Sequence, residues 1–303
     1  MPSNMSNQRV VCCALLDRGV LLGLGLALLF ICPLAAQQPA KPLTGHSDAV
    51  TSVAYTPDGK IIATASFDRT IKLWNATTGA ELRTFAGHDG QILSLAISSD
   101  GRSLVSGSRD NTVKLWDVFI PHPIKQLPAH EQPLTEILVS KDGEWLVSGG
   151  ADNAVKIWQR ADDKLLQDLK AHAAPITRID LRSDKSQLAT ADAQGRIIIW
   201  NPVDGTSLGE IGAHATSVSG IAFHPTTQTL FSTGDDGLLK TWQLPLIAPK
   251  VLAGSATPLS TVAISPDGKL SLISGEDKVI RIYDSSTGQA VRTLAGLTSA
   301  VTA

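Results

Sequence analysis

The sequence predicts an all-β fold made of repeated four-stranded antiparallel sheets stacked around an axis. Two recurring intervals predict it. Five tryptophans, Trp74, Trp116, Trp158, Trp200 and Trp242, follow one another at intervals of 42 residues. Five histidines, His46, His88, His130, His172 and His214, keep the same interval. A fixed period of this length indicates one small structural unit copied along the chain.

One unit is readable in residues 43–85. Four short runs of β-favouring residues alternate with turn signals, which are Pro-Asp-Gly at 57–59, Asp-Arg at 68–69 and Thr-Gly at 78–79. No segment has helical periodicity, and the runs are too short for helices. Because one such sheet cannot bury its own faces, neighbouring units are expected to stack around an axis. The absence of insertions over five repeats favours a closed, regular assembly.

At this point the pattern resembles the WD40-repeat family of β-propellers. The resemblance rests on Gly45-His46, Gly87-His88 and Trp116-Asp117, and it covers residues 43–303. It implies a WD40-type β-propeller of four-stranded blades with six repeats and the start of a seventh. The expected repeats lie near 43–85, 86–127, 128–169, 170–211, 212–251 and 252–294, with an incomplete seventh at 295–303.

The resemblance also implies a structural set of four side chains in each repeat: a histidine, a hydroxyl, an aspartate and a tryptophan. We expect these to form a buried chain of hydrogen bonds in which each polar group satisfies another. By offset, the complete sets are His46, Thr64, Asp68 and Trp74; His88, Ser106, Asp110 and Trp116; His130, Ser148, Asp152 and Trp158; and His214, Ser232, Asp236 and Trp242.

Two repeats depart from this set. Repeat four keeps His172, Thr190 and Trp200, but Gln194 stands where the aspartate is expected. Repeat six has Ser255, Ile273, Asp277 and Tyr283 at the four positions. These two blades are therefore expected to be less rigid than the others.

Ser, His and Asp together invite a hydrolase interpretation. Here they recur four times at equal spacing with a tryptophan attached, which favours a device for burying polar groups over an active site. We therefore expect no catalytic residue, no cofactor and no metal: histidines on different blades cannot converge on one ion, and the three cysteines all precede the first repeat. A net charge of −2 gives no basic field for nucleic acid.

The N-terminus indicates export. Arg9 and Arg18 precede an apolar run at 19–32, and small residues follow at Ala35 and Ala36. This order is typical of a secretory signal peptide over residues 1–36, followed by a linker at 37–42. The run of 14 residues is short for a membrane span, which needs about 20. An uncleaved anchor through residues 19–32 is the alternative, and the expected protein is a bacterial, exported one.

Members of the family commonly bind proteins on the face where the aspartate turns cluster. By offset, the side chains that stand out on this face are Phe67, Gln91, Leu93 and Arg109 on neighbouring repeats, with Asp235 and Glu276 across the ring. An aromatic and an arginine beside an aliphatic residue make a plausible anchor patch. The alternative is that Phe67 packs under a loop and Arg109 pairs with a neighbour.

These features predict a non-catalytic, monomeric scaffold that binds a protein or peptide and does not insert its propeller into a membrane. The alternative is a docking domain at the N-terminus of a larger enzyme whose sequence continues after Ala303. Residues 299–303 match the opening of a further first strand. A fragment of a longer protein, a six-bladed ring and an open array therefore remain alternatives.

Overall fold

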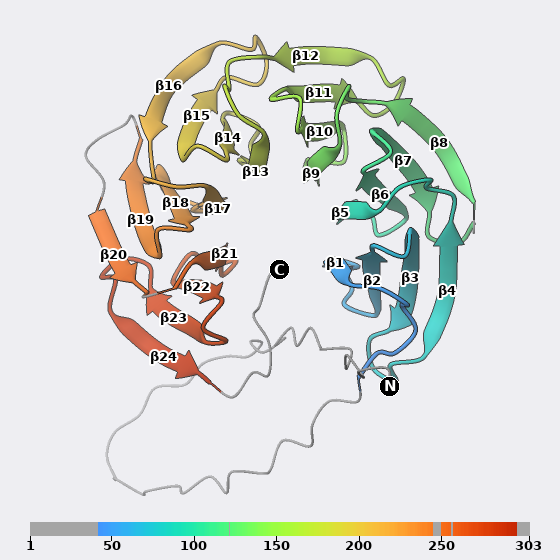
Figure 1. Cartoon of the computed structure of the whole chain (residues 1–303), viewed down its shortest axis with the longest axis horizontal. Coiled ribbons are helices and arrows are strands. Elements are labelled where there is room, and N and C mark those ends of the chain that lie inside the picture. Colours follow the sequence, from blue (N-terminus) through green and yellow to red (C-terminus); the bar gives the residue numbers. More distant parts are fainter. Residues whose placement is uncertain (1–41, 121, 245–249, 256, 296–303) are drawn as a thin grey trace, which may run out of the picture.

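The structure is a computed structural model that describes residues 42–120, 122–244, 250–255 and 257–295. The expected signal segment, nearly all of the linker and residues 296–303 of the expected seventh unit lie outside the described residues. Within those ranges the chain forms six four-stranded antiparallel sheets, arranged as blades around a central axis (Figure 1). The predicted all-β propeller of four-stranded blades is confirmed.

The first three blades contain twelve strands in chain order. Blade one has β1 (Val50–Tyr55), β2 (Ile61–Ser66), β3 (Thr70–Asn75) and β4 (Glu81–Ala86). Blade two has β5 (Ile92–Ile97), β6 (Ser103–Ser108), β7 (Thr112–Asp117) and β8 (Pro123–Pro128). Blade three has β9 (Leu134–Val139), β10 (Trp145–Gly150), β11 (Val155–Gln159) and β12 (Leu165–Leu169).

The remaining three blades repeat this order. Blade four has β13 (Ile176–Leu181), β14 (Leu188–Asp192), β15 (Arg196–Trp200) and β16 (Ser207–Gly212). Blade five has β17 (Val218–Phe223), β18 (Thr229–Gly234), β19 (Leu238–Gln243) and β20 (Lys250–Gly254). Blade six has β21 (Leu259–Ile264), β22 (Leu270–Gly275), β23 (Ile280–Asp284) and β24 (Ala290–Leu294). In every blade the first strand lies nearest the axis and the fourth lies outermost (Figure 1).

The turn residues identified in the sequence close the hairpin between the first two strands of a blade. In blade one the Thr56 hydroxyl donates to Asp58 at 2.7 Å, and the Gly59 amide donates to the Thr56 carbonyl at 2.8 Å. Gly59 has a φ of 68°, which glycine adopts without a steric penalty. Blade four makes the same turn with Lys185 at a φ of 58°.

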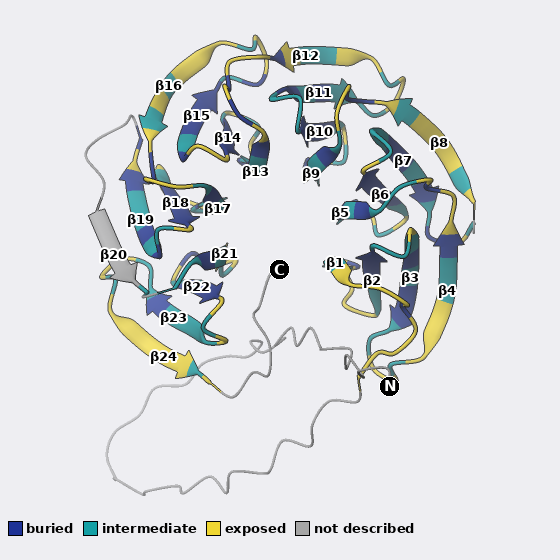
Figure 2. Ribbon diagram, in the orientation of Figure 1, coloured by how far each residue is buried: buried dark blue, intermediate teal, exposed yellow. Residues whose placement is uncertain are grey.

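The hydrophobic core lies between the blades. At the junction of blades one and two, Ile71 and Phe85 pack against Ile92, Leu104 and Trp116, and none of the five is more than 1 % exposed. Burying one such side chain contributes roughly 1.5–3 kcal/mol to folding. Comparable clusters occupy the next four junctions. The middle strands are accordingly buried and the outer strands largely exposed (Figure 2).

The junction between blade six and blade one is open among the described residues. The inner strands pack in the series β1, β5, β9, β13, β17 and β21, and no comparable packing joins β21 to β1. The first residue of the inner strand is at most 1 % exposed in blades two to six, whereas Val50 of blade one is 37 % exposed. Among the described residues the leading face of blade one therefore has no sheet against it. The closed assembly stays a prediction, because residues 1–41 and 296–303 lie outside the described residues.

The described ranges contain no helix long and apolar enough to cross a membrane.

Candidate functional site

The four-residue set of blade one forms a continuous chain of hydrogen bonds. The Trp74 indole N–H donates to the Thr64 hydroxyl at 2.8 Å, and that hydroxyl donates to His46 Nε2 at 2.8 Å. His46 Nδ1 donates to Asp68 Oδ2 at 2.8 Å. The protonated nitrogen of the imidazole is assigned from this network, since the carboxylate can only accept. Each polar side chain of this set therefore has a hydrogen-bond partner within the set.

The same series of hydrogen bonds recurs in blades two, three and five. The histidine Nδ1 to carboxylate distances are 2.7, 2.9 and 2.8 Å, and the imidazole Nε2 to hydroxyl distances are 2.7, 2.8 and 2.8 Å. The hydroxyl residues Ser106, Ser148 and Ser232 are 0 % exposed. A nucleophile must meet its substrate within hydrogen-bond reach, and these hydroxyls are buried behind their own partners. Each set links the segment before the first strand to the second and third strands of the same blade, and its hydroxyl is buried.

Burial and hydrogen bonding fix the charge states of this network. Burial lowers the pKa of His130, His172 and His214 below the usual histidine value. Although burial opposes it, hydrogen bonds from Thr70 and His46 lower the pKa of Asp68 to about 2. Near neutral pH these imidazoles are uncharged and the Asp68 carboxylate is ionised. That is the combination in which a neutral imidazole donates to a carboxylate and accepts from a hydroxyl.

Blade four contains a complete set, so the expectation that it lacks the carboxylate is wrong. His172 Nδ1 donates to Asp192 Oδ2 at 2.7 Å, and Thr190 and Trp200 complete the chain at 2.7 and 2.8 Å. The other oxygen of Asp192 accepts the Gln194 and Arg196 amides. Gln194 itself is exposed. The sequence signal was present two residues before the expected position, and the assumption of a fixed offset concealed it.

Blade six replaces the set with other contacts. Ile273 and Tyr283 are buried at the hydroxyl and tryptophan positions. The Ser255 hydroxyl donates to Asp277 at 3.3 Å, and Arg281 donates to the same carboxylate at 2.5 Å. The carboxylate of this turn is therefore held by a guanidinium in place of an imidazole.

Phe67 and Arg109 come together on the face that carries the aspartate turns. The Arg109 guanidinium carbon lies 5.5 Å from the centre of the Phe67 ring, which joins blade one to blade two by a cation–π contact. Arg109 is exposed and Phe67 is half-buried. Arg109 therefore pairs with a neighbouring side chain, as the alternative expected, and the patch itself stays a prediction.

The other residues of the expected patch divide into two groups. Gln91 and Leu93 of blade two are half-buried, and the Gln91 carbonyl accepts the Arg109 amide at 2.9 Å. Asp235 and Glu276 are exposed in the corresponding turns of blades five and six. The structure thus places a cation and an aromatic ring on blades one and two, and two carboxylates on blades across the axis (Figure 1).

Comparison with known proteins identifies the repeated unit. The family described as "WD domain, G-beta repeat" matches residues 37–75, 79–117, 121–159, 163–201, 205–243 and 249–284. These six matches cover most of the chain. The chain is a WD40-repeat protein.

Curated WD40 relatives align with it only over single stretches. Notchless protein homolog of Arabidopsis thaliana is 49 % identical over 53 residues, or 18 % of this chain and 11 % of the relative. Ribosome assembly protein 4 of Saccharomyces cerevisiae is 45 % identical over 53 residues, or 18 % and 10 %. Protein Mut11 of Chlamydomonas reinhardtii is 44 % identical over 52 residues, or 17 % and 14 %. The chain therefore matches about a tenth of the length of these relatives.

WD40-repeat proteins are typically non-catalytic scaffolds for protein interactions. In this WD40 chain, the residues that the structure describes contain no group of three or more His, Cys, Asp or Glu side chains arranged to hold a metal ion. Its turn face carries an exposed cation beside a half-buried aromatic ring and, across the axis, two exposed carboxylates.

Proposed function

We propose that this chain is a monomeric, non-catalytic scaffold that binds a protein or peptide on the turn face of its propeller. The Arg109–Phe67 contact carries the proposal, because it presents an exposed guanidinium over an aromatic ring at the seam of two blades. Arginine and aromatic residues are the side chains most enriched at energetic centres of interfaces. Gln91 and Leu93 extend this patch along blade two.

The charge distribution on the face defines the partner further. Arg109 attracts an acidic group, and the partly exposed Phe67 ring offers an apolar contact. Asp235 and Glu276 attract a basic group on the other side of the axis. A segment with an acidic, apolar end and a basic end satisfies both sides. Nucleic acid does not fit this pattern, because carboxylates oppose its phosphates.

Paired substitutions test the patch. The variant carrying Phe67→Ala and Arg109→Glu is expected to lose native partners, with affinity reduced about 30-fold or more, as removal of an interface centre does. Arg102→Glu is the matched control, since Arg102 is an exposed arginine of the same blade in the hairpin at the opposite end of the strands. Quantitative affinity purification measures partner recovery for each variant. Equal recovery of every partner by the double variant would contradict the proposal.

An exported location is part of the same proposal and rests on residues 1–36 of the sequence. N-terminal sequencing of the mature protein is expected to begin near Gln37. A mature chain that still carries residues 19–32 would support the membrane-anchored alternative.

A further inference from the structure

The inner strands of blades three and four carry charged side chains at a position where the other blades have small ones. Glu136 is the third residue of β9, and Arg178 is the third residue of β13. The same position holds Ser52, Ser94, Gly220 and Thr261 in the other four blades. Taking a charge out of water costs free energy, so charged groups where small residues suffice indicate a use beyond folding.

Both side chains are accessible beside the axis. β9 and β13 are the innermost strands of their blades (Figure 1), and the Glu136 and Arg178 side chains are 26 % and 34 % exposed. Their chain neighbours Ile137 and Ile179 are buried and belong to clusters that include the preceding blade. Successive side chains of a strand point to opposite faces. Glu136 and Arg178 therefore point away from those clusters.

The pair has unused hydrogen-bonding capacity. Glu136 Oε2 lies 3.6 Å from Arg178 Nη1, which is longer than a hydrogen bond. Arg178 Nη1 donates to the Thr177 carbonyl at 2.7 Å, and this is the one side-chain hydrogen bond that either residue makes among the described residues. A guanidinium has five N–H donors, and the unused polar atoms of this pair are not buried. A ligand can therefore reach them.

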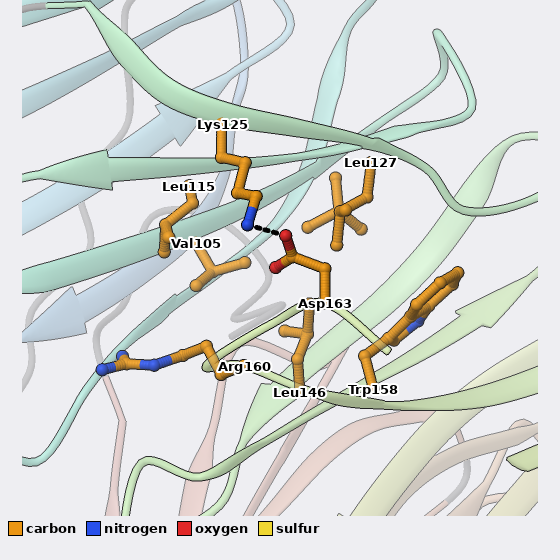
Figure 3. A pocket seen from close by; sticks show the side chains of 9 residues that line it. Val105, Leu115, Lys125, Leu127, Leu146, Trp158, Arg160 and Asp163 are labelled. Carbon is orange, nitrogen blue, oxygen red and sulfur yellow. Dashed lines mark ion pairs between the residues drawn. The ribbon is translucent and has the colours of Figure 1, made fainter. Parts of the chain in front are cut away.

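An ion pair at the outer edge of the molecule shows the contrast. Lys125 of β8 and Asp163 of the hairpin after β11 contact each other directly between blades two and three (Figure 3). The hollow that remains beside them is about 10 Å³, which is room for at most one water molecule. Each charge there has its partner in direct contact, whereas Glu136 and Arg178 stay apart.

The surrounding charges leave the guanidinium of Arg178 dominant. The charges that act on Glu136 come from Arg178 and Asp180 of β13, and the strands β5, β6 and β10 around β9 contain no ionisable side chain. Burial raises the pKa of Glu136 to about 7, so its carboxyl is largely neutral below that pH. The Asp180 oxygens accept the Phe223 and Leu181 amides at 2.6 and 3.0 Å, which engages both of them. The pair thus presents a cation beside a carboxylic acid that can donate.

We propose that Arg178 and Glu136 bind a carboxylate side chain of a peptide, with the guanidinium supplying the charge and Glu136 donating a hydrogen bond. Arginine–carboxylate contacts are frequently bidentate and roughly twice as strong as neutral hydrogen bonds. The proposal rests on the proposed scaffold function for the source of the carboxylate, which is an acidic residue of the bound partner. It places that residue on blades three and four, apart from the Phe67–Arg109 patch.

The probe is a peptide with blocked ends and a single glutamate, and its glutamine counterpart is the comparison. Amide NMR shifts of the full chain are measured during titration. The glutamate peptide is expected to cause saturable shifts at Thr177 and Arg178, with a dissociation constant on the order of 1 mM at about pH 6. Between about pH 6 and about pH 8 the affinity is expected to fall about tenfold, because the protonated fraction of a carboxyl with a pKa of about 7 falls by that factor.

Substitutions assign the effect to the two residues. Arg178→Met is expected to weaken binding more than about tenfold, whereas Glu136→Gln is expected to keep binding and lose its pH dependence. Arg102→Met, at an exposed arginine in a hairpin of blade two, is the matched control and retains both properties. The Phe67→Ala and Arg109→Glu variant keeps the shifts at Arg178, so failure of this site and failure of the patch are distinguishable.

Three outcomes would overturn the proposal. One is the absence of saturable shifts at Arg178 with the glutamate peptide, or equal shifts with the glutamine peptide. Another is an affinity that rises with pH, which is the sign expected when an ionised Glu136 does the binding. The third is full binding by an Arg178→Met protein whose thermal unfolding shows an intact fold.

Discussion

The Asp192 carboxylate of blade four shows how one buried charge holds a local structure. One oxygen accepts from His172 at 2.7 Å, and the other accepts two backbone amides of the following turn. In blade one Asp68 divides its oxygens in the same way, between His46 and the Thr70 amide. A carboxylate two residues earlier in the chain thus reaches the same partners. The hydrogen-bond network requires a carboxylate acceptor, and either of two chain positions can supply it.

Substitution separates the two candidate positions in blade four. Asp192→Asn is expected to reduce the free energy of unfolding by about 2–4 kcal/mol, because the variant leaves a buried network without its charged acceptor. Gln194→Ala is expected to change it by less than about 0.5 kcal/mol, because Gln194 is exposed. Urea unfolding of both variants measures the difference. Equal costs for the two substitutions would contradict this assignment.

At the scale of single residues, the sequence predicted most of the polar network. The sets of blades one, two, three and five follow from a fixed spacing, and the structure joins their members as expected. Asp192 was not predicted, because a fixed spacing does not show that a side chain two residues earlier can extend to the same histidine. The stacking of Arg109 on Phe67 was not found either, since it depends on two blades being brought side by side.

At the scale of elements, the inner strands β9 and β13 carry an unusual charge pair. Glu136 of β9 lies 3.6 Å from Arg178 of β13, at positions where the other blades have Ser52, Ser94, Gly220 and Thr261. Burial raises the pKa of the Glu136 carboxyl to about 7, and the nearby Asp180 charge adds to this, while Arg178 opposes it. The strands therefore hold a carboxyl that is partly protonated near neutral pH.

This pair makes stability depend on pH with a defined sign. A carboxyl whose pKa is higher in the folded state binds more protons there than in the unfolded state. Its favourable contribution is present below its unfolded pKa of about 4.5 and is lost as the pH rises through about 7. Glu136→Gln has no such titration. The difference in unfolding free energy between the variant and the unaltered protein is expected to shift toward the variant by about 1–3 kcal/mol between about pH 5 and about pH 8.

Chemical unfolding of both proteins across that pH range measures the shift, and Glu131→Gln, at an exposed glutamate of the same blade, is the control. A difference that stays constant with pH would show that Glu136 titrates normally. This carboxyl was absent from the sequence-based candidates, because its pKa depends on the burial that neighbouring blades impose.

At the scale of the whole molecule, the described residues form five packed blade junctions and place no sheet against the leading face of blade one. The first position of the inner strand is buried in blades two to six, where it packs against the preceding blade. In blade one the same position is Val50, which is 37 % exposed because the described residues place no sheet in front of it. Tyr55 at the end of the same strand is 38 % exposed.

Matched substitutions on equivalent valines test this difference. Val218→Ala in blade five is expected to reduce the free energy of unfolding by about 1–3 kcal/mol, because it opens a cavity in a packed junction. Val50→Ala is expected to cost less than about 0.5 kcal/mol, as at other exposed positions. Denaturant unfolding compares the two. A cost at Val50 as large as that at Val218 would show that blade one is covered in solution.

The number and order of blades were predictable from the sequence, because each repeat carries its own turn signals and its own aromatic residue. The exposure of blade one among the described residues was not predictable, since a repeat pattern describes only blades that are neighbours along the chain.

The central claim is that the recurring His, Ser, Asp and Trp sets hold the fold while the Phe67–Arg109 patch binds the partner. Stability and partner recovery, measured together on two variants, test it most directly. Ser148→Ala leaves His130 and Trp158 without their hydroxyl, so we predict a loss of about 1–3 kcal/mol in unfolding free energy with full partner recovery well below its Tm. The Phe67→Ala and Arg109→Glu variant is predicted to keep its stability and lose the partner. A Ser148→Ala protein that is folded yet loses the partner, or a patch variant that recovers it fully, would contradict the account.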